Sequence, residues 1–299
     1  MSIVGINTGR HIDAMNILIT GSSTGFGNLT AISLAARGHR VIATMRSPRA
    51  KNRERAAALE AFKGIEVVEL DVANDASVDK AIATALNAAG HLDAVINNAG
   101  RATIGLAETI TAEQLLELFN VNVIGMQRVN RAVLPSMRER RSGLIVHVSS
   151  SLGRWVMPLV GLYASTKWAV EALAETYRYE LKATGVDVAI VQPGAFPTEL
   201  GSVDPLGADQ QRASGYGAMA NAADAFQQRA RAMRMDPKAA NPQQVADAIV
   251  ALVETPQGQR PPRVVVDADN SPFTPELNEA HAQAQRRLLQ AIGMAALAD

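Results

Sequence analysis

The 299-residue chain contains no cysteine, which excludes disulfide bonds, thiol nucleophiles and cysteine-ligated metal sites. Histidine is scarce as well. The chain has only His11, His39, His91, His147 and His281, and none of them has the spacing of metal ligands. The sequence therefore predicts neither a metal centre nor thiol chemistry.

The sequence also has no excess of charge and no long apolar run. Its 29 basic residues balance 29 acidic residues, so nothing indicates a nucleic-acid partner or an anionic membrane surface. No apolar stretch reaches the roughly 18 residues that a membrane helix needs. Residues 1–14 have neither a basic start nor a continuous apolar segment, so we expect a flexible leader rather than a signal peptide. These observations favour a cytoplasmic protein.

What the chain does contain is an alternation of short apolar runs and longer helical patterns, which is typical of βα units around a parallel sheet. The runs are nearly uninterrupted and rich in β-branched residues, as in strands that are covered on both faces. The expected strands are Asn16–Thr20, Arg40–Thr44, Ile65–Glu69, Ala94–Asn97, Leu144–Val148, Asp187–Val191 and Arg263–Val266. The expected helices cover 26–37, 52–61, 74–89, 112–140, 164–184 and 242–254. The pattern predicts one doubly wound α/β domain over residues 15–270, with a seven-stranded parallel sheet between two helical layers.

Two segments fall outside this alternation. Residues 199–240 form a long insertion, which we expect to be a substrate loop or lid. Residues 271–299 form a C-terminal extension with an apolar stripe at helical spacing. The stripe predicts a helix with a packing or subunit-contact face, and it consists of Leu277, Ala280, Ala284, Leu288 and Ile292.

A glycine-rich segment lies between the first expected strand and the first expected helix. Its glycines allow the backbone to approach a pyrophosphate, and the helix N-terminus offers free N–H groups to it. The predicted contacts of a dinucleotide cofactor here are Gly21, Ser23, Thr24, Gly25, Phe26 and Gly27. The alternative interpretation is an ordinary glycine-rich turn.

The end of the second strand bears on which dinucleotide is bound. An NAD(H) site usually has an acidic residue there, but this chain has Met45 followed by Arg46. A guanidinium can bind a 2′-phosphate through paired charge-assisted hydrogen bonds. The sequence thus favours NADP(H), with NAD(H) as the second possibility. Alternatively, Arg46 is a solvated charge, and Arg49, Lys51 and Arg53 are close enough in sequence to share its role.

The third strand ends at Asp71 and Val72, which are candidates for contact with the adenine. An aspartate in this position can instead cap the following helix. Asn74 and Asp75 are alternative caps.

The fifth strand ends at a serine triplet, and Tyr163 follows Ser150 by thirteen residues. Tyr163 and Lys167 lie one helical turn apart on the same face. A free tyrosine titrates near pH 10, and a nearby ammonium favours its phenolate. This arrangement suits hydride transfer, in which a carbonyl oxygen gains or loses a proton. Ser149 and Ser151 remain alternatives to Ser150.

With these motifs in order, residues 15–266 resemble the short-chain dehydrogenase/reductase family. The motifs that carry the resemblance are T-G-x-x-x-G-x-G at 20–27, N-N-A-G at 97–100, V-N-V-x-G around Asn122, Ser150, Tyr163 with Lys167, and Pro193-Gly194 with Thr198. The resemblance implies a Rossmann-type fold and an oxidoreductase that interconverts an alcohol with a ketone or aldehyde.

The resemblance also implies a role for each matching residue. Tyr163 is the general acid/base, Ser150 orients the substrate oxygen, and Lys167 binds the nicotinamide ribose. Asn122, rather than Asn120, holds a water that relays protons to Lys167. The remaining cofactor contacts implied by the resemblance are Asn98, Ala99 and Gly100 beside the cofactor, and Pro193, Gly194, Phe196 and Thr198 around the carboxamide.

The segment after Ser150 suggests the substrate class. Its apolar side chains predict a wall for an apolar alcohol or ketone, and they are Leu152, Trp155, Val156, Met157 and Leu159. The same run could be ordinary core. Arg154 is interpreted either as a ligand for a substrate carboxylate or as a solvated charge.

Two other functions remain open from the sequence. One is a catalytically silent NADP(H) sensor, and the other is a nucleotide-sugar epimerase or dehydratase. Members of the family usually associate through their two long helices. We therefore expect a homodimer or homotetramer that forms through residues 112–140 and 164–184.

Overall fold

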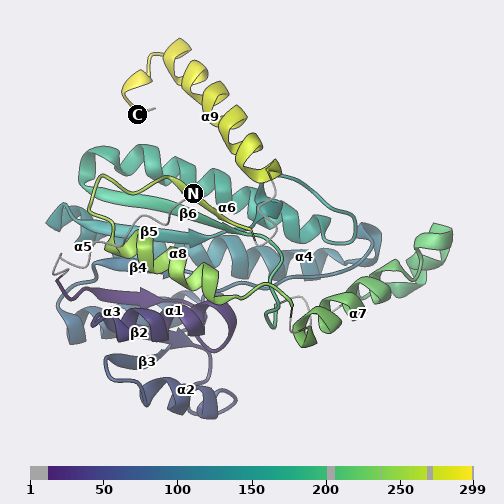
Figure 1. The fold of residues 1–299 in the computed structure, drawn as a ribbon, viewed down its shortest axis with the longest axis horizontal. Coiled ribbons are helices and arrows are strands. Elements are labelled where there is room, and N and C mark those ends of the chain that lie inside the picture. The colour runs from purple at the N-terminus through teal and green to yellow at the C-terminus, as the bar shows by residue number, and fades with distance from the viewer. Residues whose placement is uncertain (1–12, 201–205, 237, 268–271, 298–299) are drawn as a thin grey trace.

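A computed structural model describes residues 13–200, 206–236, 238–267 and 272–297 (Figure 1). The strands are β1 Asn16–Ile19, β2 Arg40–Met45, β3 Ile65–Glu69, β4 Ala94–Asn97, β5 Gly143–Val148, β6 Val186–Pro193 and β7 Arg263–Val266. The α-helices are α1 Gly25–Ala36, α2 Arg53–Glu60, α3 Asp75–Ala89, α4 Ala112–Phe119, α5 Gly125–Arg140, α6 Gly161–Leu181, α7 Ala222–Met235, α8 Gln243–Glu254 and α9 Phe273–Ala291. Shorter helical turns are η1 Ala107–Thr109, η2 Asn120–Ile124, η3 Ser151–Gly153, η4 Lys182–Thr184, η5 Gln210–Met219 and η6 Ala295–Leu297.

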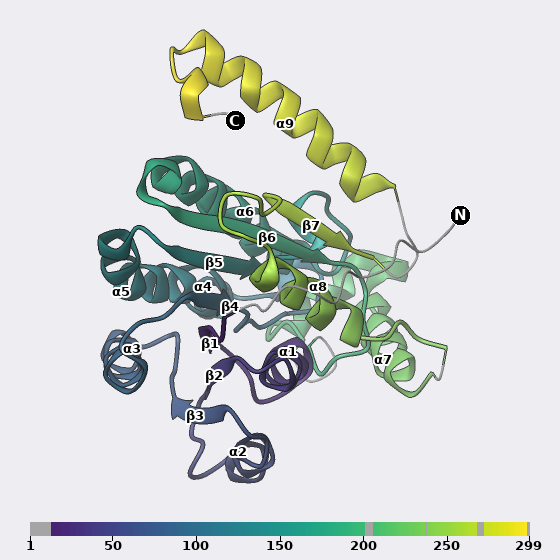
Figure 2. The same ribbon diagram turned by 60° about the vertical axis from the view of Figure 1, so that its left-hand side comes forward.

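The strands form one parallel sheet in the order β3-β2-β1-β4-β5-β6-β7. The two faces of the sheet are covered by different helices because successive residues of a strand point to opposite sides. Ile17 and Ile19 pack in the layer with α1, α2 and α8, whereas Leu18 packs in the layer with α3, α5 and α6 (Figure 2). The predicted three-layer, doubly wound Rossmann-type fold with seven parallel strands is confirmed.

The prediction of one uninterrupted helix over residues 112–140 is wrong. The structure divides it into α4, a π-helical turn at Asn120–Ile124, and α5. A π turn admits one extra residue into the helix and re-aims the side chains around it. Gly125 follows the turn, and a Cβ atom there would lie 2.8 Å from the Cβ of Val72, so the start of α5 lies directly against the connection between β3 and α3.

The sheet brings several of the predicted site residues to one edge. Thr20 follows β1, Asn97 ends β4, Ser150 follows β5 and Pro193 ends β6. In a parallel sheet the carboxyl ends of all strands meet at the same edge. The strand order reverses between β1 and β4, and ligands of doubly wound sheets bind in the crevice at that point.

The two segments outside the βα alternation are largely helical. Residues 201–205 and 237 of the expected 199–240 loop, and most of the expected leader at 1–14, lie outside the described residues. The described part of 199–240 contains η5 and α7, and Leu206 forms a parallel bridge with Ile104. The C-terminal extension forms α9, which lies at the edge of the molecule beside α6 and β7 (Figures 1 and 2).

The predicted apolar stripe on α9 does not pack against the rest of the chain. Leu277, Leu288 and Ile292 are all exposed, and the buried residues of this helix are Thr274 and Leu289. Polar side chains in the first half of α9, namely Thr274, Asn278 and His281, make hydrogen bonds to the sheet domain.

Candidate active site

The glycine-rich loop after β1 is fastened to the end of β4 by hydrogen bonds. The Thr20 hydroxyl accepts from the backbone N–H groups of Asn98 and Ala99, each at 3.0 Å. The Asn98 amide donates to the carbonyl oxygens of Thr20 at 2.9 Å and Gly21 at 3.0 Å. Thr20 was not among the predicted site residues, although it opens the glycine motif, and its hydroxyl joins the two predicted cofactor segments.

The glycine-rich loop turns tightly and packs closely against the end of β4. Gly21 has a positive φ of 71°, and a Cβ there would lie 2.8 Å from the Cα of Ala99. A Cβ on Gly27 would collide with the Asn98 amide and lie 2.5 Å from the carbonyl oxygen of Gly21. Thr24, at the start of α1, makes no side-chain capping hydrogen bond to the first turn. The N–H groups of that turn are therefore available to an anion, which fits a dinucleotide phosphate.

At the end of β2, Met45 is buried and Arg46 is exposed. The Arg46 carbonyl accepts a hydrogen bond from the Asn52 side chain at 2.7 Å, which fixes the turn into α2, and the Arg46 side chain is exposed to solvent. Arg49 contacts Glu60 at 3.8 Å. Arg46 is thus placed at the carboxyl edge of the sheet, where a ribose phosphate would lie.

Asp71 and Val72 lie at the end of β3. The Asp71 carboxylate accepts from the backbone N–H of Ala73 at 3.0 Å, and α3 is capped by Asn74, whose side chain accepts from Ser77 at 2.8 Å. Of the three capping residues that the sequence allowed, Asn74 is therefore the one that caps α3. Val72 lines a small cavity beside the reacting centre.

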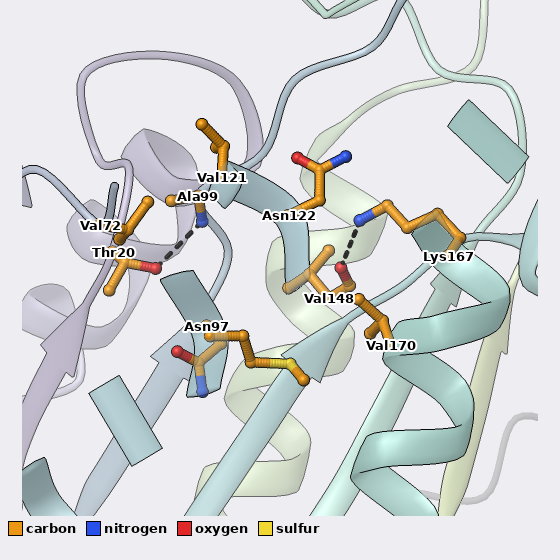
Figure 3. Close-up of a pocket in the computed structure, with 10 residues that line it drawn as sticks. Thr20, Val72, Asn97, Ala99, Val121, Asn122, Val148, Lys167 and Val170 are labelled. Atoms are coloured by element: carbon orange, nitrogen blue, oxygen red, sulfur yellow. Dashed lines mark hydrogen bonds between the residues drawn. The ribbon is translucent and has the colours of Figure 1, made fainter. Parts of the chain in front are cut away.

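This cavity lies between the glycine loop and α6 and has room for about one water molecule (Figure 3). Its lining includes the predicted residues Val72, Ala99, Asn122 and Lys167. It also includes six residues that were not predicted for the site: Thr20, Asn97, Val121, Met126, Val148 and Val170. The Lys167 ammonium donates to the Val148 carbonyl at 2.9 Å, two residues before Ser150 (Figure 3). This hydrogen bond joins the end of β5 to α6, the helix that carries Tyr163 and Lys167.

Ser150, Tyr163 and Lys167 are all buried; Lys167 bonds Val148, two residues before Ser150, and Leu152, two residues after it, packs against Tyr163. The Lys167 Nζ atom lies 5.7 Å from the centre of the Tyr163 ring. The Ser150 hydroxyl accepts from the Leu152 N–H at 3.1 Å and lies 3.4 Å from the Pro193 carbonyl oxygen. Ser149 packs against Gly153, whose added Cβ would lie 2.9 Å from the Ser149 Oγ, so of these two serines it is Ser150 that faces the end of β6.

Asn122 is the buried residue of the π turn. Its side chain accepts from the N–H of Arg101 and donates to the carbonyl of Arg101, both at 2.8 Å, and it donates to the Thr166 hydroxyl at 3.0 Å. A Cβ on Gly100 would lie 3.5 Å from the Asn122 Oδ1 and 4.0 Å from the Lys167 Nζ. Asn120 instead accepts from Arg128 at 2.8 Å, on the side of α3.

Burial lowers the pKa of Lys167 to about 8, and the Glu171 carboxylate one turn further along α6 raises it in part. Burial also lowers the pKa of His147 to about 3, so this ring stays neutral at ordinary pH. Lys167 is thus the cation beside Tyr163, and its ammonium titrates close to neutral pH.

The lowered pKa of Lys167 makes the stability of the protein depend on pH. The unfolded lysine keeps its proton up to about pH 10.5, whereas the folded one releases it above about pH 8, so the lysine favours folding more as the pH rises through this window. Lys167→Met removes the titration. Between pH 7 and pH 10, the unfolding free energy of the wild type should therefore rise relative to that of the variant, by an amount on the order of 3 kcal/mol.

Urea titrations of both proteins at the two pH values measure this difference. The control is Lys80→Met on the exposed surface of α3, which should show no such divergence. A difference between the wild type and Lys167→Met that does not change with pH would contradict the buried titration.

The segment after β6 closes over the glycine loop. Phe26 and Phe196 meet edge to face, with ring centres 5.7 Å apart and an interplanar angle of 83°. A Cβ on Gly25 would lie 3.6 Å from the Cβ of Thr198. The structure thus brings the predicted phosphate segment and the predicted nicotinamide segment together, and Gly194 lies against Asp267, which an added Cβ would approach to 2.9 Å.

The five residues that were predicted to form the substrate wall lie in different surroundings. Leu152 packs against Tyr163, and Leu152, Met157 and Leu159 also pack around a small apolar cluster of Ile104, Val160 and Ala223. Val156 is 68% exposed and does not line an enclosed wall. The Trp155 indole donates to the Thr274 hydroxyl on α9 at 3.1 Å.

The prediction for Arg154 is also wrong, because it is neither a solvated charge nor a free ligand for a substrate carboxylate. It is buried rather than solvated, and the carboxylate it contacts is the chain's own Glu171, at 3.3 Å.

The sequence profile of the short-chain dehydrogenase family matches residues 15–205, more than half of the chain. The chain belongs to the short-chain dehydrogenase family. The match includes the glycine loop, the end of β4, Ser150, Tyr163 and Lys167.

Several characterised proteins resemble this short-chain dehydrogenase. The 3-ketodihydrosphingosine reductase of Bacteroides thetaiotaomicron is 37% identical over 182 residues, which are 61% of this chain and 64% of that protein. Retinol dehydrogenase 8 of Homo sapiens is 34% identical over 188 residues, 62% and 60% of the two chains. The 17-beta-hydroxysteroid dehydrogenase type 6 of Homo sapiens is 38% identical over 193 residues, 64% and 59% of the two chains. The chain thus spans less than two thirds of the length of these relatives.

Solved structures also resemble this short-chain dehydrogenase. A short-chain dehydrogenase from Streptomyces avermitilis has a TM-score of 0.73 and 29% identity, covering 93% of this chain and 96% of the other. An alcohol dehydrogenase from Thermococcus sibiricus, complexed with 5-hydroxy-NADP, has a TM-score of 0.69 and 27% identity, covering 86% and 98%.

Neither a membrane helix nor a metal cluster was expected. No helix within the described ranges is long and apolar enough to span a bilayer. The same residues include no group of three or more side chains that could hold a metal ion. The cytoplasmic location stays a prediction.

Proposed function

We propose that this short-chain dehydrogenase is an NADP(H)-dependent oxidoreductase that interconverts an alcohol with the corresponding ketone or aldehyde of an apolar small molecule. The observation that carries the proposal is the placement of Lys167 beside Tyr163 at the carboxyl edge of the sheet, next to the turn that contains Ser150. The Lys167 ammonium lies 5.7 Å from the Tyr163 ring and is held by the carbonyl at the end of β5.

Tyr163, Lys167 and Ser150 each have a different role in the proposed proton transfer. In reduction the Tyr163 hydroxyl would donate its proton to the substrate oxygen, and in oxidation the Tyr163 phenolate would accept that proton. The Lys167 ammonium favours the phenolate form because an opposite charge stabilises it in a low-dielectric site. The Ser150 hydroxyl accepts from the Leu152 N–H and donates to the Pro193 carbonyl over a long 3.4 Å bond, which a bound substrate oxygen would replace as the acceptor.

The residues around the glycine loop fit a dinucleotide, which supplies or accepts the hydride when it is bound. The uncapped first turn of α1 would hold the pyrophosphate, and the exposed Arg46 would bind the 2′-phosphate of NADP(H). Asp71 and Val72 would lie beside the adenine. Asn98, Ala99, Gly100 and the segment from Pro193 to Thr198 would flank the nicotinamide end.

An apolar substrate is supported by the side chains around Tyr163 and by the relatives. Leu152 and Ala102 pack against the ring of Tyr163, and an apolar cluster with Met157 and Leu159 lies beyond them. The similar proteins are named for a ketodihydrosphingosine, a retinol and a hydroxysteroid, which are all largely apolar.

The proposal is tested by following NADPH absorbance with a panel of apolar ketones, including steroid, retinoid and long-chain compounds. We expect oxidation of NADPH that depends on the ketone and is faster than with polar ketones of the same size. NADPH binding without turnover of any panel member would instead favour a cofactor sensor.

We also propose that the protein forms a homo-oligomer through α4, α5 and α6. Large apolar side chains are exposed on α4, on the π turn and on α6, namely Leu116, Ile124 and Trp168. Exposed large apolar side chains are often buried at subunit contacts.

A further inference from the structure

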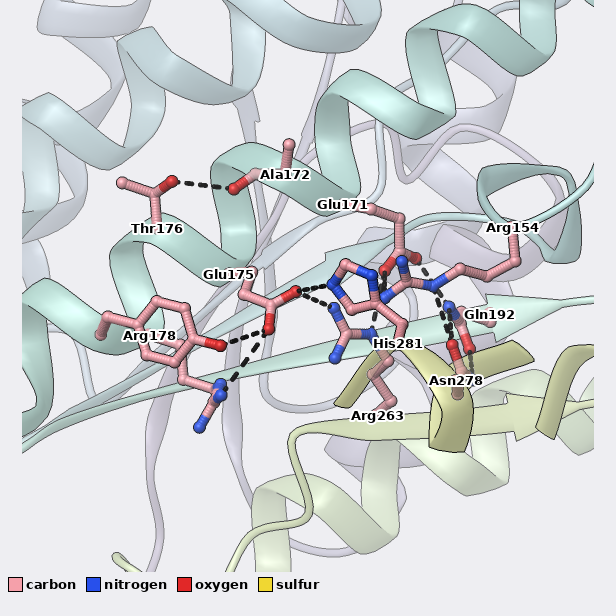
Figure 4. A network of polar contacts seen from close by, with 11 residues as sticks. Arg154, Glu171, Ala172, Glu175, Thr176, Arg178, Gln192, Arg263, Asn278 and His281 are labelled. Carbon is pink, nitrogen blue, oxygen red and sulfur yellow. Dashed lines mark hydrogen bonds and ion pairs between the residues drawn. The ribbon is translucent and has the colours of Figure 1, made fainter. Parts of the chain in front are cut away.

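The C-terminal helix α9 reaches the reacting centre through a cluster of four polar side chains, which we call the buried polar cluster: Arg154, Glu171, Gln192 and Asn278 (Figure 4). Arg154 follows η3, Glu171 lies on α6, Gln192 on β6 and Asn278 on α9. Arg154, Glu171 and Gln192 are buried. Four elements that are distant in sequence therefore meet in one place.

Asn278 makes three of the hydrogen bonds in this cluster. Its Oδ1 accepts from the Arg154 Nε at 2.8 Å and from the Gln192 Nε2 at 3.3 Å. Its Nδ2 donates to the Gln192 Oε1 at 2.7 Å. The amide of α9 thus joins the segment after Ser150 to the strand that ends beside Ser150.

The cluster is continuous with the helix that carries Tyr163 and Lys167. Arg154 contacts the Glu171 carboxylate at 3.3 Å, and Gln192 donates to the same carboxylate at 2.9 Å. Glu171 lies one helical turn after Lys167, on the buried face of α6. Arg263 on β7 also donates to Glu171, at 3.0 Å.

The turn that contains Ser150 depends on this support. A Cβ on Gly153 would lie 2.9 Å from the Cγ of Glu171, so the turn rests directly on α6. Pro193, whose carbonyl oxygen lies 3.4 Å from the Ser150 Oγ, follows Gln192 immediately. A shift of Gln192 would therefore move Pro193, which contacts Ser150. A shift of Arg154 would move the end of the turn that follows Ser150.

We propose that α9 is a positioning element of the active site, in which Asn278 holds Arg154 and Gln192 and so fixes the Ser150 turn against α6. This inference rests on the proposed function for the role of Ser150. A buried guanidinium that loses a hydrogen-bond partner must find another or draw water in, and both responses displace the turn. Misplacement of a catalytic group by as little as 1 Å can cost about 100-fold in rate.

The test compares Asn278→Ala with two control variants on the same helix. His281→Ala removes a different contact between α9 and α6, the 3.3 Å contact with Glu175. Gln283→Ala removes only an exposed bond within α9, to Glu279 at 2.8 Å. Asn278→Ser, whose hydroxyl is too short to reach both partners, repeats the test with a polar side chain.

Two readouts are needed. The first is hydrogen–deuterium exchange at the N–H groups of Leu152, Gly153 and Arg154, which bond within the turn at 3.1, 2.9 and 2.9 Å. The second is kcat for ketone reduction, measured together with NADPH affinity. For Asn278→Ala and Asn278→Ser we expect faster exchange in the turn and a kcat lowered by about 10- to 100-fold with unchanged NADPH affinity. Neither control should change either readout.

Unchanged exchange in the turn of the two Asn278 variants would overturn the proposal, whatever the rate. Equal effects of His281→Ala would also overturn it, because the helix would then act only by its general attachment. A wild type that turns over no ketone would defeat the proposed function, and the exchange rates would still decide whether Asn278 positions the turn.

Discussion

Tyr163→Phe should lower kcat for ketone reduction by about 100- to 10 000-fold, the range that a general acid contributes. The substitution removes the transferable proton but keeps the ring, which packs with Leu152, Ala102 and Leu118. The glycine loop and Arg46 are not altered, so NADPH should bind as it does to the wild type. Steady-state rates and a fluorescence titration with NADPH measure the two effects separately.

Tyr177→Phe is the matched control for this prediction. Tyr177 lies on the same helix, and its hydroxyl donates to the Gln127 Oε1 at 2.6 Å, away from Ser150. Its loss should leave kcat unchanged. A Tyr163→Phe variant that reduces ketones at the wild-type rate would remove Tyr163 from the chemistry, and a variant that also loses NADPH affinity would point to a structural role.

Arg46→Ala should weaken NADPH binding by about 10- to 100-fold and leave NADH binding almost unchanged. Hydrogen bonds to a charged group contribute about 1.5–3 kcal/mol, and only NADPH carries the 2′-phosphate. The side chain is exposed at the end of β2, and the turn that carries it is held by the Asn52 bond to its carbonyl, which alanine preserves. Titration of both cofactors into the wild type and the variant gives the ratio.

Arg53→Ala removes the same charge at the first residue of α2 and serves as the control. It should weaken NADPH only slightly, through the long-range potential. Equal losses for NADPH and NADH in Arg46→Ala would contradict the 2′-phosphate role. A larger loss of NADPH affinity, relative to NADH affinity, in Arg53→Ala would assign the 2′-phosphate role to Arg53.

The strands and the layers of the fold could be predicted because they follow from local composition. β-Branched apolar runs such as Ile17–Ile19 and Leu144–Val148 are buried on both faces, and each ends where the pattern ends. The place of these residues in the chain was also predictable, since Ser150 follows a strand and Tyr163 and Lys167 share one helical face.

The break in the expected 112–140 helix could not be predicted from the sequence. The π turn is accompanied by hydrogen bonds of Asn122 to Arg101 and Thr166, which are 21 and 44 residues away. Helical periodicity carries no information on partners so distant in sequence.

The attachment of α9 was missed for a related reason. Periodicity identified the apolar stripe with Leu277, Leu288 and Ile292, yet these side chains are exposed, and Asn278 and His281 make the contacts. An apolar stripe predicts which face prefers burial, but not whether a partner lies within the same chain. Arg154 was misread because its partner Glu171 becomes its neighbour only after folding.

The most direct test of the central claim is the transfer of label from NADPH that is deuterated at the transferable hydrogens of the nicotinamide. A single turnover with an apolar ketone should place one deuterium on the carbinol carbon of the alcohol product, as mass spectrometry would show. Consumption of the ketone with no deuterium in the product, or no alcohol at all while NADPH stays bound, would contradict an alcohol–carbonyl oxidoreductase.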